Sequence, residues 1–439
     1  MDVSNLREAL PDVDANINVH VEVCQNSISV ASRLHIETHA KEFLLNQATR
    51  ISDDVMFLEF PADSFLAANV EYIYVSEIIQ VPFQHENEAV GGECNFIFYV
   101  FQLNTDDPGN EQLDEAEEGT AAIHWILPNK AFDGLWQTLI YDVSIKASLL
   151  SYVSAMLIFS EKHIDPNIIS WNRVVLLHGP PGTGKTTLCK ALAQKLVVRL
   201  SHRYQYGQLI EINSHSLFSK WFSESGKLVL NMFHKIQELL ENPSSLVVIL
   251  IDEVESLAAA RTASMSGSDP SDAIRVVNAL LTQLDSLKKY SNVLILTTSN
   301  VTRAIDIALV DRADIKQYIG LPSPPARFSI LKSCITELMN KKIIYPQTCL
   351  MDIKALEFAR FKPNEYNCHS LQLWEIVLQC EGLSGRTLRK LPLLAYARLC
   401  CRNEEVTMES YLTALKVAVE NKLSENAEIG SGDIQPSVL

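Results

Sequence analysis

A glycine-rich segment follows a short apolar run in the order that suits phosphate binding. Residues 174–177 are apolar, and the segment after them contains Gly179, Pro180, Pro181, Gly182, Thr183, Gly184, Lys185, Thr186 and Thr187. Its spacing matches G-x-x-x-x-G-K-[ST], and a helical apolar pattern continues at residues 188–196. Glycines let backbone N–H groups converge on phosphate oxygens, and a helix N-terminus adds positive potential. We therefore predict that this segment binds the phosphates of ATP, with Lys185 at the β- and γ-phosphates.

Two acidic residues and an amide follow the next apolar runs of the chain. Asp252 and Glu253 come directly after residues 246–251, at the strand end where open α/β sheets place their ligands. We predict that the Thr186 hydroxyl and Asp252 hold Mg²⁺, Asp252 partly through water. Glu253 can polarise the water that attacks the γ-phosphate. Asn300 ends the following strand, where its amide either orients the same water or serves as a turn residue.

The apolar pattern divides the chain into parts that position these residues. Residues 1–104 alternate short apolar runs with turn signals, which predicts a small α/β or α+β domain. Residues 105–120 contain many acids and no Lys or Arg, so we predict a flexible acidic linker or a solvated loop of no special role. Residues 121–321 alternate β-branched strands with amphipathic helices, which is typical of a parallel sheet covered on both faces.

The strand signal fades after Pro322, and helical patterns replace it. Residues 322–423 therefore form a predicted helical domain, and residues 424–439, rich in Gly, Ser, Asn and Pro, form a predicted flexible tail. The predicted buried strands are 174–177, 209–212, 246–251, 293–297 and 315–319, and the predicted helices of the last domain are 328–339, 370–378, 385–399 and 408–418.

Length, charge and cysteine usage bound the class of protein. At roughly 150 residues per domain, 439 residues suggest two or three domains. The 37 basic and 53 acidic residues give a net charge of −16, which repels nucleic-acid backbones. The uncharged stretch 147–160 is shorter than the ~20 residues of a membrane span, and residues 1–7 lack a secretory h-region. Nine cysteines without C-x-x-C spacing indicate free thiols in the cytosol or nucleus.

The combination of GPPGTGKT, LIDEVESL and TTSN with a helical domain after the sheet resembles the AAA+ ATPases. The closer resemblance is to the pachytene checkpoint protein 2 family, also called thyroid receptor-interacting protein 13. It covers about residues 123–418 and rests on four runs: 208–227, 271–285, 310–320 and 381–392. The resemblance implies an AAA+ P-loop large domain, a C-terminal helical lid and an N-terminal domain that recognises substrate or adaptor.

The same resemblance implies an activity and partners. Members of the family form hexameric rings that hydrolyse ATP with Mg²⁺ to remodel HORMA-domain proteins, and we expect such partners here, reached through a HORMA-fold adaptor. No direct nucleic-acid binding and no membrane association are expected. The family implies roles in meiotic axis remodelling, recombination and synapsis and in inactivating the spindle checkpoint, with location in nucleus and cytoplasm, on meiotic chromosomes and at kinetochores.

Three other classes share the nucleotide motif. A nucleic-acid motor or clamp loader would present several Lys and Arg residues in its pore. A nucleotide-gated scaffold with little turnover has no use for Glu253. An AAA metalloprotease would carry H-E-x-x-H, which this sequence lacks. The remodeller is therefore the leading hypothesis.

The resemblance also assigns two arginines to the reaction. Arg386, next to Gly385, falls at the sensor-2 position, where a cation of the lid touches the γ-phosphate. Arg312 resembles the arginine finger that reaches the nucleotide of a neighbouring subunit. Arg303 and Arg275 are alternatives for that finger.

Two large aromatic residues lie among small polar ones after the strand at 209–212. Lys220, Trp221 and Phe222 match the first pore loop of AAA+ unfoldases, whose aromatic residue grips an extended polypeptide; packing in the core is the alternative. Residues 262–271, rich in Gly and Ser, fit a mobile second pore loop.

Overall fold

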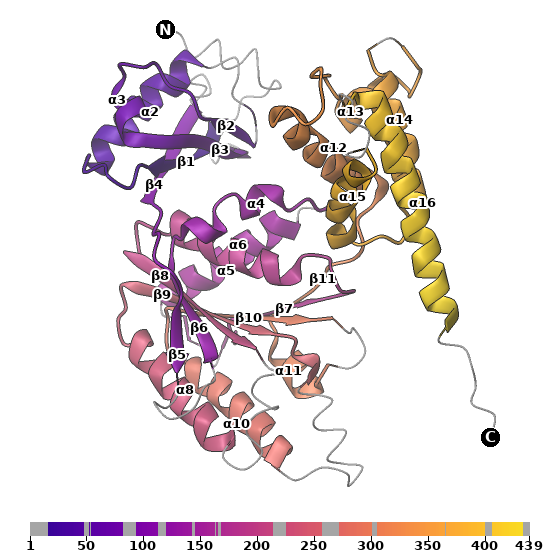
Figure 1. The fold of residues 1–439 in the computed structure, drawn as a ribbon. Coiled ribbons are helices and arrows are strands. Elements are labelled where there is room, and N and C mark those ends of the chain that lie inside the picture. Colours follow the sequence, from indigo (N-terminus) through magenta and orange to yellow (C-terminus); the bar gives the residue numbers. More distant parts are fainter. Residues whose placement is uncertain are drawn as a thin grey trace, which may run out of the picture.

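Three bodies follow one another along the chain (Figure 1). The computed structural model describes residues 16–47, 52, 54–81, 94–112, 120–142, 145–162, 164–165, 168–213, 225–256, 272–300, 305–364, 366–399 and 406–432. We call the bodies the N-domain (16–102), the large domain (109–321) and the lid (322–432). Within the described residues, no helix has the length and apolar character needed to cross a membrane.

The N-domain is a four-stranded sheet covered by helices, which confirms the predicted small α/β or α+β domain. The strand order is β2-β3-β1-β4, with β1 antiparallel to β3 and parallel to β4. Val19, Val21 and Val23 are buried on one face of β1, and Glu22 and Cys24 are buried on the other face. Its elements are β1 (Asn16–Gln25), α2 (Arg33–Asn46), β2 (Val55–Phe57), α3 (Phe65–Asn69), β3 (Val70–Val81) and β4 (Cys94–Gln102).

The large domain is built on a seven-stranded sheet of order β11-β7-β10-β9-β8-β6-β5. All five predicted strands are confirmed, and β11, β7, β10, β9 and β8 run parallel to one another. The strands are β5 (Gly109–Gln112), β6 (Thr120–Leu127), β7 (Val174–His178), β8 (Tyr206–Asn213), β9 (Ser245–Asp252), β10 (Val293–Ser299) and β11 (Ile315–Tyr318).

The edge of this sheet adds two antiparallel strands to the predicted parallel sheet and corrects the predicted linker. β6 pairs antiparallel with β8, and β5 pairs antiparallel with β6, so the sheet is mixed rather than wholly parallel. β5 also lies inside residues 105–120, which were predicted to be a linker. Residues 109–112 form a strand because a segment beside an open sheet edge can satisfy its backbone hydrogen bonds by pairing.

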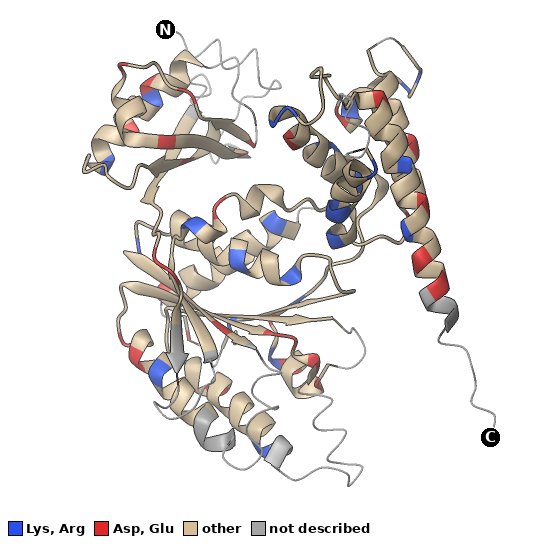
Figure 2. Ribbon diagram, in the orientation of Figure 1, with Lys and Arg blue, Asp and Glu red and all other residues tan. Residues whose placement is uncertain are grey.

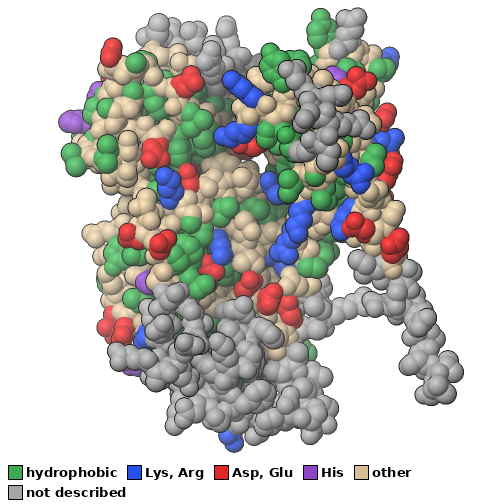
Figure 3. Space-filling model, in the orientation of Figure 1, with side chains coloured by type: hydrophobic (Ala, Val, Ile, Leu, Met, Phe, Trp, Pro, Cys, Tyr) green, Lys and Arg blue, Asp and Glu red, His purple; other side chains and the backbone are tan. Residues whose placement is uncertain are grey.

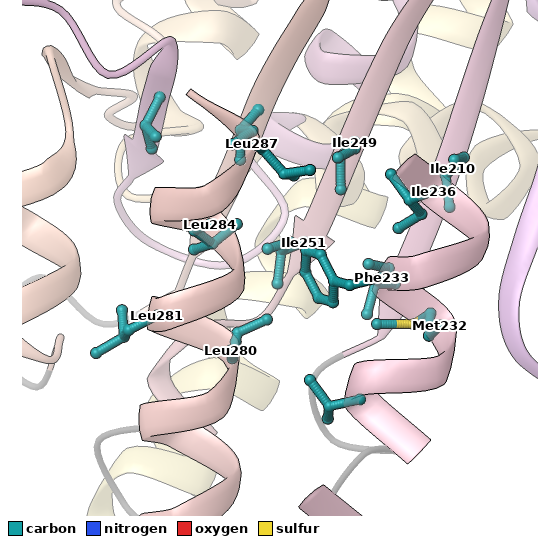
Figure 4. Packing of buried hydrophobic residues seen from close by; sticks show 14 of the residues in the cluster. Ile210, Met232, Phe233, Ile236, Ile249, Ile251, Leu280, Leu281, Leu284 and Leu287 are labelled. Carbon is teal, nitrogen blue, oxygen red and sulfur yellow. The ribbon is translucent and has the colours of Figure 1, made fainter. Parts of the chain in front are cut away.

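Helices cover both faces of the large-domain sheet (Figure 1). α5 and α6 pack on one face and α8 and α10 on the other, which explains why the central strands are buried along nearly their whole length. The helices are α4 (Leu135–Thr138), α5 (Ile145–Glu161), α6 (Lys185–Arg199), α8 (Ser225–Leu240), α10 (Asp272–Leu287) and α11 (Ile307–Arg312). Figure 4 shows the core under α8 and α10, with side chains that include Met232, Phe233, Ile236, Ile249, Ile251, Leu280, Leu284 and Leu287.

The lid is helical, as predicted, with its own apolar core. Its helices are α12 (Pro324–Asn340), α13 (Ile353–Phe358), α14 (Cys368–Gln379), α15 (Gly385–Ala397) and α16 (Met408–Gly432). The prediction of a flexible tail from residue 424 is wrong for residues 424–432, because α16 continues through them. Composition misled there: an exposed polar helix can continue past its packed part, and Lys422 pairs with Glu425 at 2.8 Å in this stretch.

Candidate active site

The glycine-rich segment forms a tight loop between β7 and α6. Gly182 and Gly184 have φ values of 76° and 88°, a left-handed conformation that a side chain would strain. α6 begins directly after Gly184, so its first N–H groups border the loop. The Lys185 ammonium is buried and donates to Gly179 O at 3.0 Å and Pro180 O at 2.8 Å. The predicted phosphate-binding residues therefore form one compact site.

The predicted magnesium ligands are in direct contact. The Thr186 hydroxyl lies 2.9 Å from Asp252 Oδ1 and 3.2 Å from Oδ2. Thr298, on the neighbouring strand β10, donates its hydroxyl to Asp252 Oδ1 as well. The structure thus adds Thr298 to the site. Its place in TTSN, at the carboxyl end of a strand, was the available signal.

Glu253 leaves the strand in a strained backbone conformation. Its φ is 58°, a left-handed value that costs roughly 1–2 kcal/mol for a residue with a side chain. Thr298 holds this turn from both sides: the Glu253 N–H donates to the Thr298 hydroxyl at 3.3 Å, and the Val254 N–H donates to Thr298 O at 3.0 Å. The Glu253 side chain is exposed at the end of the strand.

Glu255 is a second residue that the sequence interpretation missed. Both of its carboxylate oxygens accept from the Asn300 N–H at 3.2 Å. This contact joins the turn after β9 to the end of β10 and fixes the backbone of Asn300. Burial lowers the pKa of the Lys185 ammonium, while Glu255 and Asp252 oppose that lowering. A polyanion in the loop would therefore stabilise a cation that burial disfavours.

The lid contacts the phosphate loop directly. The Arg386 N–H donates to Gly182 O at 3.0 Å, and a Cβ on Gly182 would lie only 2.7 Å from Ser384 Oγ. Gly385 starts α15 at this contact. The Arg386 side chain is exposed beside the loop, and Figure 3 shows Lys and Arg side chains gathered where the lid meets the large domain. The structure thus brings both predicted lid residues to the loop.

Two hollows flank the loop between the large domain and the lid. Their volumes are about 370 and 310 Å³. Both are walled by a segment before α5 that the sequence interpretation missed; a Cβ on Gly184 would lie 3.1 Å from Tyr141 Oη and 3.2 Å from Leu139. Residues shared by both hollows are Ile140, Tyr141, Thr183, Ile330 and Gly385. This mostly apolar space beside a phosphate loop suits the base and ribose of a nucleotide.

The other predicted residues lie elsewhere. Arg312 ends α11 and binds Asp285 and Ala308 of its own chain rather than the phosphate loop. Arg275 is an exposed residue of α10. Lys220, Trp221, Phe222 and Arg303 lie outside the described residues, as do residues 262–271. Their assigned roles stay predictions.

Comparisons with protein families assign each body of the fold. Residues 175–321 match the ATPase family associated with various cellular activities (AAA). Residues 323–423 match the TRIP13-like AAA+ ATPase lid C-terminal domain, and residues 14–106 match the TRIP13 N-terminal domain. Fold and site therefore define an ATPase of the AAA+ class, which confirms the predicted fold class.

Individual relatives narrow this class. The pachytene checkpoint protein 2 homolog of Xenopus tropicalis is 54% identical over 422 residues, which cover 96% of this chain and 97% of that protein. The human protein of the same name is 52% identical over 430 residues, 98% of this chain and 99% of that protein. The chain belongs to the pachytene checkpoint protein 2 family, as the sequence resemblance predicted.

Solved structures agree with this assignment. The structure of PCH-2 from C. elegans is 37% identical, with a TM-score of 0.74, and covers 93% of this chain and 100% of that one. A chain of the E. coli HORMA:CdnC:Trip13 complex, 18% identical, shares the fold with a TM-score of 0.50 over 70% of this chain and 97% of that one.

Proposed function

We propose that this chain is an ATP-hydrolysing remodeller of HORMA-domain proteins that works as a homo-hexameric ring. The observation that carries the proposal is the joined site of Lys185, Thr186 and Asp252 in a chain of this family. The site supports nucleotide chemistry, and the E. coli HORMA:CdnC:Trip13 complex, which contains a chain of the same fold, supports the class of substrate.

The residues present fit ATP with Mg²⁺. The Thr186 hydroxyl and the Asp252 carboxylate are hard oxygen ligands of the kind that Mg²⁺ prefers. The buried Lys185 ammonium has only carbonyl partners at the loop, and burial lowers its pKa, so an anionic ligand suits it. Bound ATP with Mg²⁺ supplies the electrophilic γ-phosphorus and neutralises charge as the leaving group departs.

The chain's own residues then divide the work. Glu253 accepts the proton of the attacking water, and Asn300 orients that water. Thr298 holds Glu253 and Asp252 in one arrangement. Arg386 contributes a cation from the lid. Loss of the γ-phosphate removes the partner of this cation, and the lid then moves against the large domain.

Hydrolysis is coupled to the substrate through the ring. Trp221 and Phe222 grip an extended segment of a HORMA protein, and the N-domain recruits the folded substrate through a HORMA-fold adaptor. Arg312 acts on the nucleotide of the neighbouring subunit. We place these steps in meiotic axis remodelling, recombination, synapsis and checkpoint inactivation, in nucleus and cytoplasm, on meiotic chromosomes and at kinetochores.

Phosphate release by the purified full chain tests the proposal. Hydrolysis should require Mg²⁺ and rise when a HORMA-domain protein is added with its adaptor. Lys185→Met should abolish both basal and stimulated rates, because it removes the buried cation. Light scattering should give a hexamer in ATP. Turnover that ignores every HORMA protein offered would contradict the substrate assignment and leave the ATPase assignment standing.

A further inference from the structure

A cluster of buried charges joins the N-domain to the large domain. Glu22 of β1 and Lys195 and Arg199 of α6 are only 5%, 4% and 9% exposed. Glu22 Oε1 lies 2.6 Å from Lys195 Nζ and 3.3 Å from Arg199 Nε. Charged side chains are almost never buried this deeply unless they are paired, so the N-domain carboxylate and the two cations depend on each other.

Arg199 binds two further strands of the N-domain. Its Nη2 donates to Ser76 Oγ at 3.0 Å and to Glu77 Oε2 at 3.2 Å on β3. Its Nη1 lies 3.0 Å from His20 Nδ1 on β1, and its guanidinium faces the Tyr99 ring of β4 at 5.2 Å. One residue of α6 therefore contacts three of the four strands of the N-domain.

The surroundings of Lys195 make the pair with Glu22 hard to replace by water. The ammonium lies 5.0 Å from the centre of the Tyr74 ring and 5.6 Å from that of Trp136. Burial lowers the pKa of Lys195, and Glu22 opposes that lowering. The positive and negative groups balance, with Lys195 and Arg199 facing Glu22 and Glu77.

The helix that carries these cations is the helix that begins at the phosphate loop. α6 has 15 residues and so runs about 21 Å from Lys185 to Arg199. Gln194 of α6 also accepts from the buried Asn129 N–H at 2.8 Å, and Asn129 bridges to Asn104 in the connection after the N-domain. Figures 1 and 2 show α6 between the N-domain and the sheet, with basic residues on the helices of this layer.

We propose that Glu22, through Lys195 and Arg199, is a positioning residue that couples the placement of the N-domain to nucleotide binding at the other end of α6. The proposal rests on the proposed function, because it requires a nucleotide at Lys185. α6 is a rigid element: its first turn borders the phosphate loop, and its last turns contact the N-domain. A nucleotide that shifts or stiffens the first turn of α6 therefore changes how the N-domain packs on the last turns. Because such coupling is reciprocal, a variant that weakens the packing of the N-domain on α6 changes nucleotide affinity by the same factor.

Hydrogen exchange of the full chain, with and without Mg²⁺ and ADP, tests this coupling. In the parent protein, ADP should slow exchange of the β1 and β3 amides by about fivefold, the lower end of ordinary allosteric coupling. Glu22→Gln keeps the shape and removes the charge, so most of this response should disappear while exchange in α8 and α10 still matches the parent. ADP affinity, measured with a fluorescent analogue, should fall by a similar factor.

Control variants separate coupling from a general loss of stability. Glu42→Gln changes an exposed carboxylate on α2 and should leave the response intact. If Glu22→Gln fails to fold, Glu77→Gln decides, because this partner of Arg199 is one-third exposed and its loss is milder. The proposal would be overturned if ADP did not slow exchange of the β1 amides in the parent. It would also be overturned if ADP slowed that exchange equally in the parent and in the Glu22→Gln or Glu77→Gln variant. A parent that binds no ADP would instead contradict the proposed function and remove the basis of the coupling.

Discussion

Arg312 and Asp285 form a two-point ion pair within one chain. Arg312 Nε donates to Asp285 Oδ1 at 3.1 Å, and Nη2 donates to Oδ2 at 2.6 Å. Nη1 donates to Ala308 O at 2.8 Å, so the plane of the guanidinium is fixed by α10 and α11. The hydrogen bonds from Arg312 lower the pKa of Asp285. The chain thus orients the residue that the sequence predicts to reach a neighbouring subunit.

Asp285→Asn tests this orientation. Asn offers one acceptor where the carboxylate offers two, so Arg312 should lose its fixed direction. We expect turnover in the hexamer to fall about tenfold at saturating ATP, with ADP affinity unchanged, because a finger acts on the transition state. Asp311→Asn, an exposed neighbour of Arg312, should keep the parental rate. Equal rates in both variants and the parent would show that Asp285 does not direct a finger.

Thr298→Val removes the hydroxyl shared by Asp252 and Glu253. Thr298 is 2% exposed, and Val has nearly its shape. We expect turnover to fall about 100-fold, the scale for one preorganised polar group, and the Mg²⁺ requirement to rise. Enzyme assays over a Mg²⁺ series check both effects.

Thr297→Val is the matched control on the same strand. Thr297 is also buried, but its hydroxyl bonds to Val175 O at 3.1 Å, not to the acidic residues. Each variant should lose about 1–3 kcal/mol of unfolding free energy, the cost of an unsatisfied buried polar group. Only Thr298→Val should lose activity. Similar activities of the two would reduce Thr298 to a stabilising role.

The local sequence pattern predicted those parts of the fold and of the site that are formed by short contiguous segments of the chain. The strand at 174–177, the loop from Gly179 to Thr186 and the start of α6 are contiguous, so their order alone implies a phosphate site. Strands buried on both faces stand out as β-branched runs. Asp252 and Asn300 could be assigned to one site from the sequence, because parallel strands bring their carboxyl ends to one edge of the sheet.

Contacts between distant segments could not be predicted this way. Arg199 and Glu22 are 177 positions apart, and their pairing depends on how the N-domain sits on α6. The role of Glu255 depends on the turn after β9, which the left-handed Glu253 creates. β5 forms because a sheet edge is available, which composition does not reveal.

Glu253→Gln separates nucleotide binding from hydrolysis. The variant keeps Lys185, Thr186 and Asp252 and loses the group that accepts a proton from water. We expect parental ATP affinity, turnover lowered by at least about 100-fold, and stable hexamers in ATP. Nucleotide titration, phosphate release and light scattering check the three outcomes. Hydrolysis within a few-fold of the parent would mean that another residue activates the water.

Acidification should weaken the packing of the N-domain on α6 through protonation of His20. Burial, together with Arg199 and Lys195, lowers the pKa of His20 to about 4, although Glu77 and Glu22 raise it. Between pH 6.5 and 4 the unfolded chain therefore binds more protons than the folded one. The contribution of His20 to the free energy of unfolding is thus complete above pH 6.5 and is lost as pH falls toward 4.

His20→Asn isolates that contribution, because its side-chain oxygen can accept from Arg199 without titrating. Melting curves at several pH values should show the parent losing stability between pH 6.5 and 4.5 faster than the variant. Parallel curves for the two proteins would exclude His20 as the titrating group.

Trp221→Ala separates a remodeller from the rival classes. Trp221 and Phe222 lie among small polar residues, a pattern that suits a loop in a pore better than a core. A wide apolar ring can wedge between side chains of any extended peptide, and a methyl group cannot. Lys185, Asp252 and Asn300 belong to other segments of the chain, so ATP binding and ATPase should persist while HORMA conversion is lost. Trp221→Phe should keep most conversion, because it retains a ring. A Trp in the core would instead cost about 3–5 kcal/mol when truncated, so a collapsed melting temperature supports packing, and unchanged conversion excludes the pore loop.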